Sequence, residues 1–272
     1  MISRHLIKYV LVAAMRDKLM MTLMLMTLLG AAIAVFMGSA TVTEENSFSI
    51  VFGAGGLRIL GVIGLVLFCT FYVRRSFENK EVEFLLSRPI SRISFLLSHA
   101  AAFAILALFV ASLMTFVVFV IGHSNLTGLL VWGMSISSEY IIMTVASLFF
   151  SMVLTSAAGS ALATLGFYAL CRMMGTVLGI VATSPQAMVA IMGSFMKIIS
   201  IIIPRFDLMG QTSWLVYGVK GSAGITFLSN TSDYVVGFVQ NVGLSGFILI
   251  QSILFVGLLL AAAAYDFYRR EF

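Results

Sequence analysis

The sequence predicts an all-α integral membrane protein. We expect six transmembrane helices, an N-terminal amphipathic surface helix, a cytoplasmic helix between two of the spans, and interfacial helices on the outer face. Composition, six long apolar runs and an uneven placing of basic residues predict this fold. Of the 272 residues, 61% are hydrophobic and 10% are charged, whereas soluble domains carry roughly 45–50% apolar and about 25% charged residues. We therefore expect a single membrane domain over residues 1–272 with almost no soluble part.

Residues 1–18 form the expected surface helix. Apolar side chains such as Leu6 and Val10 fall on one helical face, and four Lys or Arg side chains line the rest together with His5. This pattern is typical of a basic amphipathic helix that lies on a membrane surface.

Six apolar runs come next along the chain and are interpreted as spans, because a bilayer-spanning helix needs about 20 mostly apolar residues. The expected spans cover residues 19–41, 49–73, 94–121, 140–154, 161–181 and 244–264. Residues 123–138 are interpreted as a loop, and the small residues of 155–160 as a tight turn.

The segment 182–240 is expected to form an outer-face cap between the fifth and sixth spans. Its run 187–203 is apolar, but it contains Lys197 and is bounded by Pro185 and Pro204. We therefore interpret this run as helices that lie at, or re-enter from, the outer surface. Aromatic residues farther along suit the headgroup level of a membrane, namely Trp214, Tyr217, Phe227 and Tyr234.

The basic residues predict the orientation. Eleven Lys and Arg residues fall in the N-terminal segment, the 74–92 loop and the C-terminus, whereas the opposite side has only Lys197, Arg205 and Lys220. Because cytoplasmic loops carry the excess of Lys and Arg, both termini and the 74–92 loop are expected in the cytoplasm. The formal charge of +5 thus indicates orientation and not nucleic-acid binding.

The chain lacks the sequence motifs of several common catalytic, phosphate-binding and metal-binding sites. The sequence has no GxxxxGK[ST] phosphate loop, no HExxH and no GxSxG, and its three histidines are scattered, so no catalytic residues and no metal-ligand set are expected. The predicted spans contain essentially no Asp or Glu, which argues against a proton-coupled transporter that uses carboxylate relays. We expect the chain not to be an enzyme by itself, with energy supplied from elsewhere.

Two arginines fall within the expected spans and are candidates for a substrate path. Arg172 lies near the middle of the fifth span, where a charged side chain costs at least about 2.5 kcal/mol. It either lines a cavity and contacts an anionic or zwitterionic substrate, or it bonds to backbone carbonyls or extends to the cytoplasmic edge of the membrane. Arg58 is nearer the outer edge of the second span, where we expect its side chain to reach the interface.

The cytoplasmic segment between the second and third spans is the most informative part of the sequence. Ser76 is suited to cap a helix, Glu78 complements its positive end, and Pro89 ends it. Between these start and end signals, Phe77, Glu81, Phe84 and Leu85 recur at helical spacing. The segment 76–88 is therefore predicted to be a short amphipathic helix parallel to the membrane.

The stretch Glu81-Val-Glu-Phe-Leu-Leu-Ser-Arg-Pro-Ile-Ser-Arg92 resembles the first cytoplasmic loop of type-2 permease subunits of ATP-binding-cassette (ABC) exporters. That loop typically consists of an acidic helix followed by Leu-Leu-Ser-x-Pro-Ile-Ser-Arg. The basic N-terminal helix and the count of six spans are similar too. The family often has Gly-Thr after the acidic residue, where this chain has Val82-Glu83, so the register of the helix can differ.

The resemblance implies an unidentified substrate exported across a bacterial cytoplasmic (inner) membrane. Two copies of a separate ATPase subunit would bind the ATP and magnesium, so this chain would hold no cofactor, and a second permease copy would complete a homodimer. The 76–88 helix would then be a coupling helix whose ATPase contacts are Phe77, Glu78, Glu81, Glu83, Phe84, Leu85 and Arg88.

A non-transport role is the alternative. The chain would then be a membrane scaffold or assembly factor that docks some other cytoplasmic protein through the 76–88 helix. Dependence on nucleotide distinguishes the two hypotheses, because a transporter needs an ATPase partner and a scaffold does not.

Overall fold

The computed structural model describes residues 3–39, 45–81, 91–122, 126–183, 195–196, 199–200, 203–216 and 233–269. Over these residues all regular structure is helical, with no strand. The elements are α1 (Arg4–Arg16), α2 (Lys18–Ser39), α3 (Glu45–Glu78), α5 (Arg92–Ile121), α6 (Leu126–Val153), α7 (Ala157–Thr183), α9 (Phe206–Gln211), α10 (Ser213–Val216) and α12 (Asp233–Arg269).

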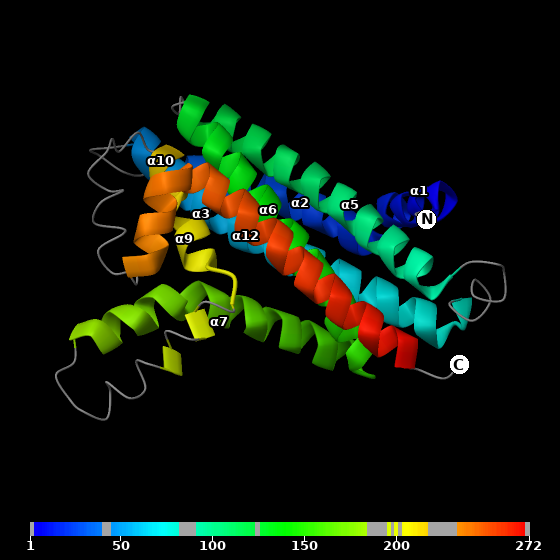
Figure 1. Ribbon diagram of the computed structural model, residues 1–272. Coiled ribbons are helices and arrows are strands. Elements are labelled where there is room, and N and C mark those ends of the chain that lie inside the picture. Colours follow the sequence, from blue (N-terminus) through cyan, green and yellow to red (C-terminus); the bar gives the residue numbers. More distant parts are fainter. Residues whose placement is uncertain are drawn as a thin grey trace.

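Six helices are long and apolar enough to cross a membrane, which confirms the expected all-α, multi-pass fold. The qualifying stretches are Lys18–Ser39, Phe52–Glu78, Arg92–Ile121, Leu126–Val153, Ala157–Ile180 and Asn241–Arg269. Helix α1 and the C-terminal end of α12 lie at one end of the bundle, and α9 and α10 lie at the other (Figure 1). This arrangement agrees with an even number of crossings.

Helix α1 packs along α5 as an amphipathic element. Leu6, Val10 and Ala14 are buried, and the backbone N–H of Ser3 donates to the Ser98 hydroxyl of α5 at 2.9 Å. The basic side chains of α1 are exposed. The pattern seen in the sequence therefore places the apolar stripe on the bundle and leaves the charges accessible.

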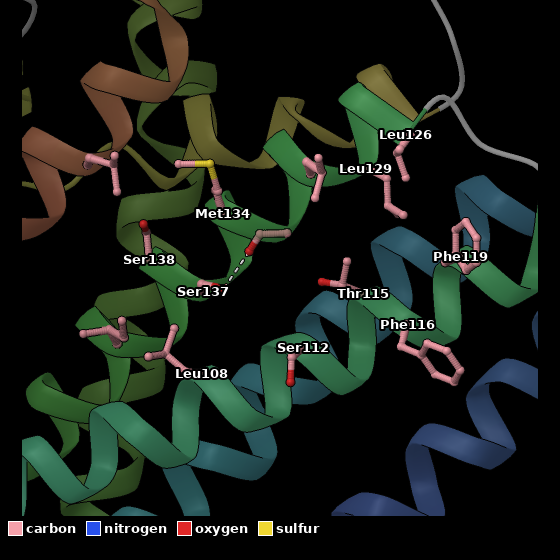
Figure 2. A pocket seen from close by; sticks show the side chains of 14 residues that line it. Leu108, Ser112, Thr115, Phe116, Phe119, Leu126, Leu129, Met134, Ser137 and Ser138 are labelled. Atoms are coloured by element: carbon pink, nitrogen blue, oxygen red, sulfur yellow. Dashed lines mark hydrogen bonds between the residues drawn. The ribbon is translucent and has the colours of Figure 1, made fainter.

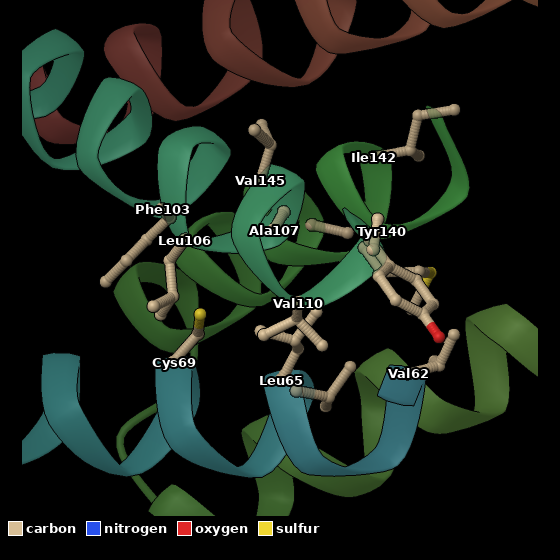
Figure 3. Packing of buried hydrophobic residues seen from close by; sticks show 14 of the residues in the cluster. Val62, Leu65, Cys69, Phe103, Leu106, Ala107, Val110, Tyr140, Ile142 and Val145 are labelled. Atoms are coloured by element: carbon tan, nitrogen blue, oxygen red, sulfur yellow. The ribbon is translucent and has the colours of Figure 1, made fainter. Parts of the chain in front are cut away.

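Helix α6 is the most buried of the six candidate spans, and it packs against α3, α5, α7 and α12. In the core, side chains of α3 meet those of α5 and α6 (Figure 3). The residues labelled there are Val62, Leu65 and Cys69 of α3, Phe103, Leu106, Ala107 and Val110 of α5, and Tyr140, Ile142 and Val145 of α6.

The expected start of the fourth span was wrong. Helix α6 begins at Leu126, so most of the expected loop 123–138 is helical. The reason is that its polar side chains have partners inside the protein. Ser137 donates to the Gly133 carbonyl of its own helix at 2.7 Å, and Ser135 donates to the Met209 carbonyl at 2.8 Å. These contacts let a polar stretch remain helical inside an apolar bundle.

Other helices also begin or end away from their expected bounds. The connection between α6 and α7 covers only residues 154–156, and the Ser156 hydroxyl accepts from the Gly159 N–H at 3.3 Å. Helix α12 begins at Asp233 and contains a kink at Gly243, whose φ of 79° suits glycine. Part of the expected cap 182–240 therefore leads into the last span.

The rest of the cap is described only in part. Its described portion contains the short helices α9 and α10, which pack against α3, α6 and α7. Most of the run 187–203 and the side chains of the aromatic residues expected at headgroup level lie outside the described residues. The interpretation of that run as non-spanning stays a prediction.

Tyr140 of α6 fixes the approach of α3. Its hydroxyl donates to the Arg58 carbonyl at 3.1 Å, and a Cβ added at Gly61 would overlap this hydroxyl. We predict that Gly61→Ala lowers the midpoint of thermal unfolding in mild detergent, because overpacking costs about 1–3 kcal/mol. Gly56→Ala on the same helix is the matched control, since nothing lies within 4 Å of its added Cβ. Equal shifts in the two variants would contradict this packing.

Candidate functional site

A fully buried ion pair joins α3 to α6. The Arg58 Nε donates to Glu139 Oε2 at 2.6 Å, and Arg58 Nη2 also contacts this oxygen. Both side chains are 0% exposed. Arg58 lies six residues into the span Phe52–Glu78 and Glu139 lies within Leu126–Val153, so the pair is inside the membrane-spanning bundle.

Neutral groups complete the surroundings of the Arg58 guanidinium. Nη2 donates to the Ser135 hydroxyl at 2.8 Å, and Nη1 donates to the Thr212 hydroxyl, just after α9, at 3.3 Å. Ser135 and Glu139 are four residues apart on α6 and so share one helical face. A buried ion pair tolerates loss of water best when further hydrogen bonds satisfy its atoms. Ser135 and Thr212 supply them for the guanidinium, whereas Glu139 Oε1 makes no hydrogen bond within the described residues.

A second ion pair lies at the start of α9. The Arg205 Nε and Nη2 donate to the two Asp207 oxygens at 2.9 and 2.7 Å, the forked geometry that arginine and carboxylate favour. Both side chains are buried. A Cβ added at Gly175 of α7 would overlap the Asp207 carboxylate. Because Gly175 has no side chain, α9 can pack closely on α7.

Arg172 of α7 is a third arginine in this region. Its Nη1 donates to the Phe206 carbonyl at 3.5 Å and lies 3.9 Å from Glu139 Oε1. The guanidinium packs on Gly210, and the side chain is 30% exposed. We call Arg58, Glu139, Arg172, Arg205 and Asp207 the charge cluster. It connects α3, α6 and α7 with the segment that contains α9.

The structure corrects three sequence-based expectations at the charge cluster. Arg58 does not reach the membrane edge; it is buried and paired with Glu139. Arg172 has a carboxylate nearby, whereas none was expected. The expectation that the spans hold essentially no acidic residue was wrong, because Glu139 lies inside α6. Glu139 was missed because the fourth span was expected to start at Tyr140, one residue later. The two arginines within the expected spans were a signal for it, because an intramembrane charge usually has a partner of opposite charge.

An apolar groove of about 680 Å³ lies mainly between α5 and α6, with Leu249 of α12 beside it (Figure 2). Three of its hydroxyl groups are satisfied by their own helices: Ser112 donates to Phe109, Thr115 to Ala111 and Ser137 to Gly133. The groove therefore offers an apolar surface with few free polar groups. Arg58 and Arg172 are not among its lining residues.

At the opposite end of the bundle, α3 reaches farther than expected. Ser76, Phe77 and Glu78 belong to its last turn, so the expected helix start at Ser76 differs from the structure. The chain then turns at Lys80, whose φ is 56°, and the Ser76 hydroxyl donates to Glu81 Oε2 at 3.1 Å. Of the expected ATPase contacts, Glu83, Phe84, Leu85 and Arg88 lie outside the described residues.

The segment rejoins the bundle at the start of α5. The Ser91 hydroxyl caps this helix by accepting from the Ser94 N–H at 3.2 Å. The Arg92 Nη1 donates to the Phe267 carbonyl, in the last turn of α12, at 3.3 Å. Both ends of the segment between α3 and α5 are therefore attached to the bundle through side-chain contacts.

Comparison with known protein families finds no family model that matches the chain, and comparison with curated proteins finds no match. The function of the chain is therefore inferred from its own residues and from their arrangement.

The buried pair provides the first test of the charge cluster. We predict that Glu139→Gln lowers the free energy of unfolding by about 3–5 kcal/mol, because it leaves the Arg58 charge buried without a counter-charge. Asp17→Asn is the control, since its partner Arg75 is largely exposed and such pairs contribute about 0–1 kcal/mol. A denaturant titration in mild detergent measures the free energy of unfolding of both variants.

Replacing both partners, Arg58→Met with Glu139→Leu, should recover much of the lost stability. A double variant no more stable than Glu139→Gln would contradict this account.

The close approach of α9 to α7 provides the second test. We predict that Gly175→Ala destabilises the protein, because the new methyl group meets the Asp207 carboxylate. Gly166→Ala on the same helix has nothing within 4 Å of its added Cβ and should be neutral or stabilising by up to about 1 kcal/mol. Thermal unfolding in one detergent compares the two variants. A Gly175→Ala protein as stable as Gly166→Ala would show that α9 does not pack here.

Proposed function

We propose that the chain is the transmembrane permease subunit of an ABC exporter, which uses ATP hydrolysed by a separate ATPase subunit. The observation that carries the proposal is the segment from Glu81 to Arg92, with its Leu-Leu-Ser-Arg-Pro-Ile-Ser-Arg run. The all-α bundle with six candidate spans and the amphipathic α1 support it. In this proposal two permease copies and two ATPase subunits form the transporter.

The position of the segment supports its role as the ATPase contact. The end of α3 and the start of α5 lie at the same end of the bundle as α1 and the C-terminal end of α12 (Figure 1). Exposed basic residues gather at this end, among them Lys8, Arg16 and Arg75. The excess of Lys and Arg favours a cytoplasmic location for this end in a bacterial inner membrane. Glu78 and Glu81 would then meet a cytoplasmic partner.

The attachments of the segment provide a route for mechanical coupling. Closure of the ATPase subunits would push on the segment, and the contact from Ser76 to Glu81 would pass the force to α3. Arg58 lies on the same helix, about 27 Å from Ser76 along the axis at 1.5 Å per residue. A displacement of α3 along this length would act on the charge cluster and on the α9 segment bound to it.

The test is to purify the full chain from its own membranes in mild detergent and to identify the proteins that come with it. We predict a co-purifying ATPase with a GxxxxGK[ST] motif. We also predict that Glu81→Arg lowers its association and its permease-dependent ATP hydrolysis at least about tenfold, since disrupting a charge pair at an interface costs about 2–5 kcal/mol. Glu45→Arg, the same change at the other end of α3, is the matched control.

The outcomes separate the two hypotheses for the chain. Loss of the ATPase in Glu81→Arg but not in Glu45→Arg supports the permease. A chain that purifies without any ATPase, and in which Glu81→Arg changes nothing, contradicts the permease and favours a scaffold that docks another cytoplasmic protein.

A further inference from the structure

The charge cluster contains one more positive than negative side chain. Arg58 is paired with Glu139, and Arg205 is paired with Asp207, which leaves Arg172 as the arginine of the cluster without a carboxylate of its own. Its nearest carboxylate oxygen in the cluster, Glu139 Oε1, is 3.9 Å away and belongs to the group that already neutralises Arg58. The described part of the cluster therefore has a surplus charge of about +1, centred on Arg172.

Hydrogen-bond donors around this surplus charge are unused. A guanidinium has five N–H donors, and within the described residues Arg172 uses one of them, toward the Phe206 carbonyl at 3.5 Å. Arg205 Nη1 is buried and makes no hydrogen bond within the described part of the chain, and the same holds for the Tyr168 hydroxyl one helical turn from Arg172. The Tyr168 ring contacts Phe206, with 5.8 Å between ring centroids. Arg172, Arg205 and Tyr168 thus keep donors that no described residue uses, and the one unused acceptor of the cluster is Glu139 Oε1.

The surplus charge is deep in the bundle and still accessible. Arg172 lies eight residues inside the end of the span Ala157–Ile180, about 12 Å along the helix axis. An unmatched charge at such a depth is unfavourable unless a partner or a ligand neutralises it. Its side chain is 30% exposed, and Ala169 and Thr176, which lie on the same face of α7, are exposed. The face of α7 that carries Arg172 is therefore open to a ligand.

We propose that Arg172 binds the phosphate or carboxylate head of a membrane amphiphile with a net negative charge, which supplies the missing negative charge. Guanidinium groups match these planar or tetrahedral oxygen arrangements through paired hydrogen bonds. Gly210 supports the geometry, because its lack of a side chain leaves room for the Arg172 guanidinium. The description of this amphiphile as the transported substrate rests on the proposed function. The binding site itself does not depend on an ATPase.

The experiment titrates the full chain, in a neutral detergent, with three probes and measures complex formation by native mass spectrometry. The probes are a phosphatidylglycerol, a phosphatidylcholine with the same acyl chains, and inorganic phosphate. We predict that Arg172→Gln weakens phosphatidylglycerol binding about tenfold, the effect of losing one charge-assisted hydrogen bond. It should weaken phosphatidylcholine binding less, because the choline cation offsets the charge of that lipid's phosphate. Arg269→Gln is the control, because this arginine lies over the Tyr265 ring at the other end of the bundle.

The variants and the probes together decide the result. Arg172→Lys keeps the positive charge but loses the paired hydrogen bonds of the guanidinium, so it should retain part of the phosphatidylglycerol binding. If Arg172→Gln does not fold, the wild-type preference for phosphatidylglycerol over phosphatidylcholine and its reduction in Arg172→Lys remain the test. Binding of inorganic phosphate that is lost without Arg172 supports the anion site with a free anion as its ligand. Equal binding of the two lipids by the wild type, or equal effects of Arg172→Gln and Arg269→Gln, overturns the proposal.

Discussion

The ion pair between Arg58 and Glu139 is the contact on which the α9 end of the bundle depends. Removing two charges from water inside an apolar bundle is unfavourable unless the partners meet closely and their remaining atoms are hydrogen-bonded. Ser135, Thr212 and the paired geometry meet this requirement for Arg58, and the remaining Glu139 oxygen lies 3.9 Å from the Arg172 guanidinium. Because Thr212 lies just beyond α9, the same guanidinium that connects α3 to α6 also holds the α9 segment. The bundle and the described part of its cap are therefore stabilised by one network.

This network explains why α6 lies at the centre of the fold. Its face with Ser135 and Glu139 meets the charge cluster, whereas its face with Gly133 and Ser137 borders the apolar groove. A helix with polar residues on two faces has a low apparent hydropathy, yet α6 is the most buried of the six candidate spans. Its polar side chains are buried because other helices, and not lipid, surround them.

The bundle could be predicted from the sequence because length and hydropathy determine whether a helix can cross a membrane. The beginning of α6 could not, since polar residues such as Ser135 and Glu139 resemble a loop until their partners on α3 and near α9 are known. Arg58 was misjudged for the same reason: pairing depends on contacts between residues 81 positions apart. Arg172 was identified as a candidate because a charge inside an apolar run is conspicuous by itself.

Arg92 ties the first turn of α5 to the last turn of α12 through the Phe267 carbonyl. Helices α5 and α12 both continue to the groove, where Leu108 and Leu249 face it together with residues of α6. The two helices are thus joined at one end of the bundle and border an apolar opening toward the other.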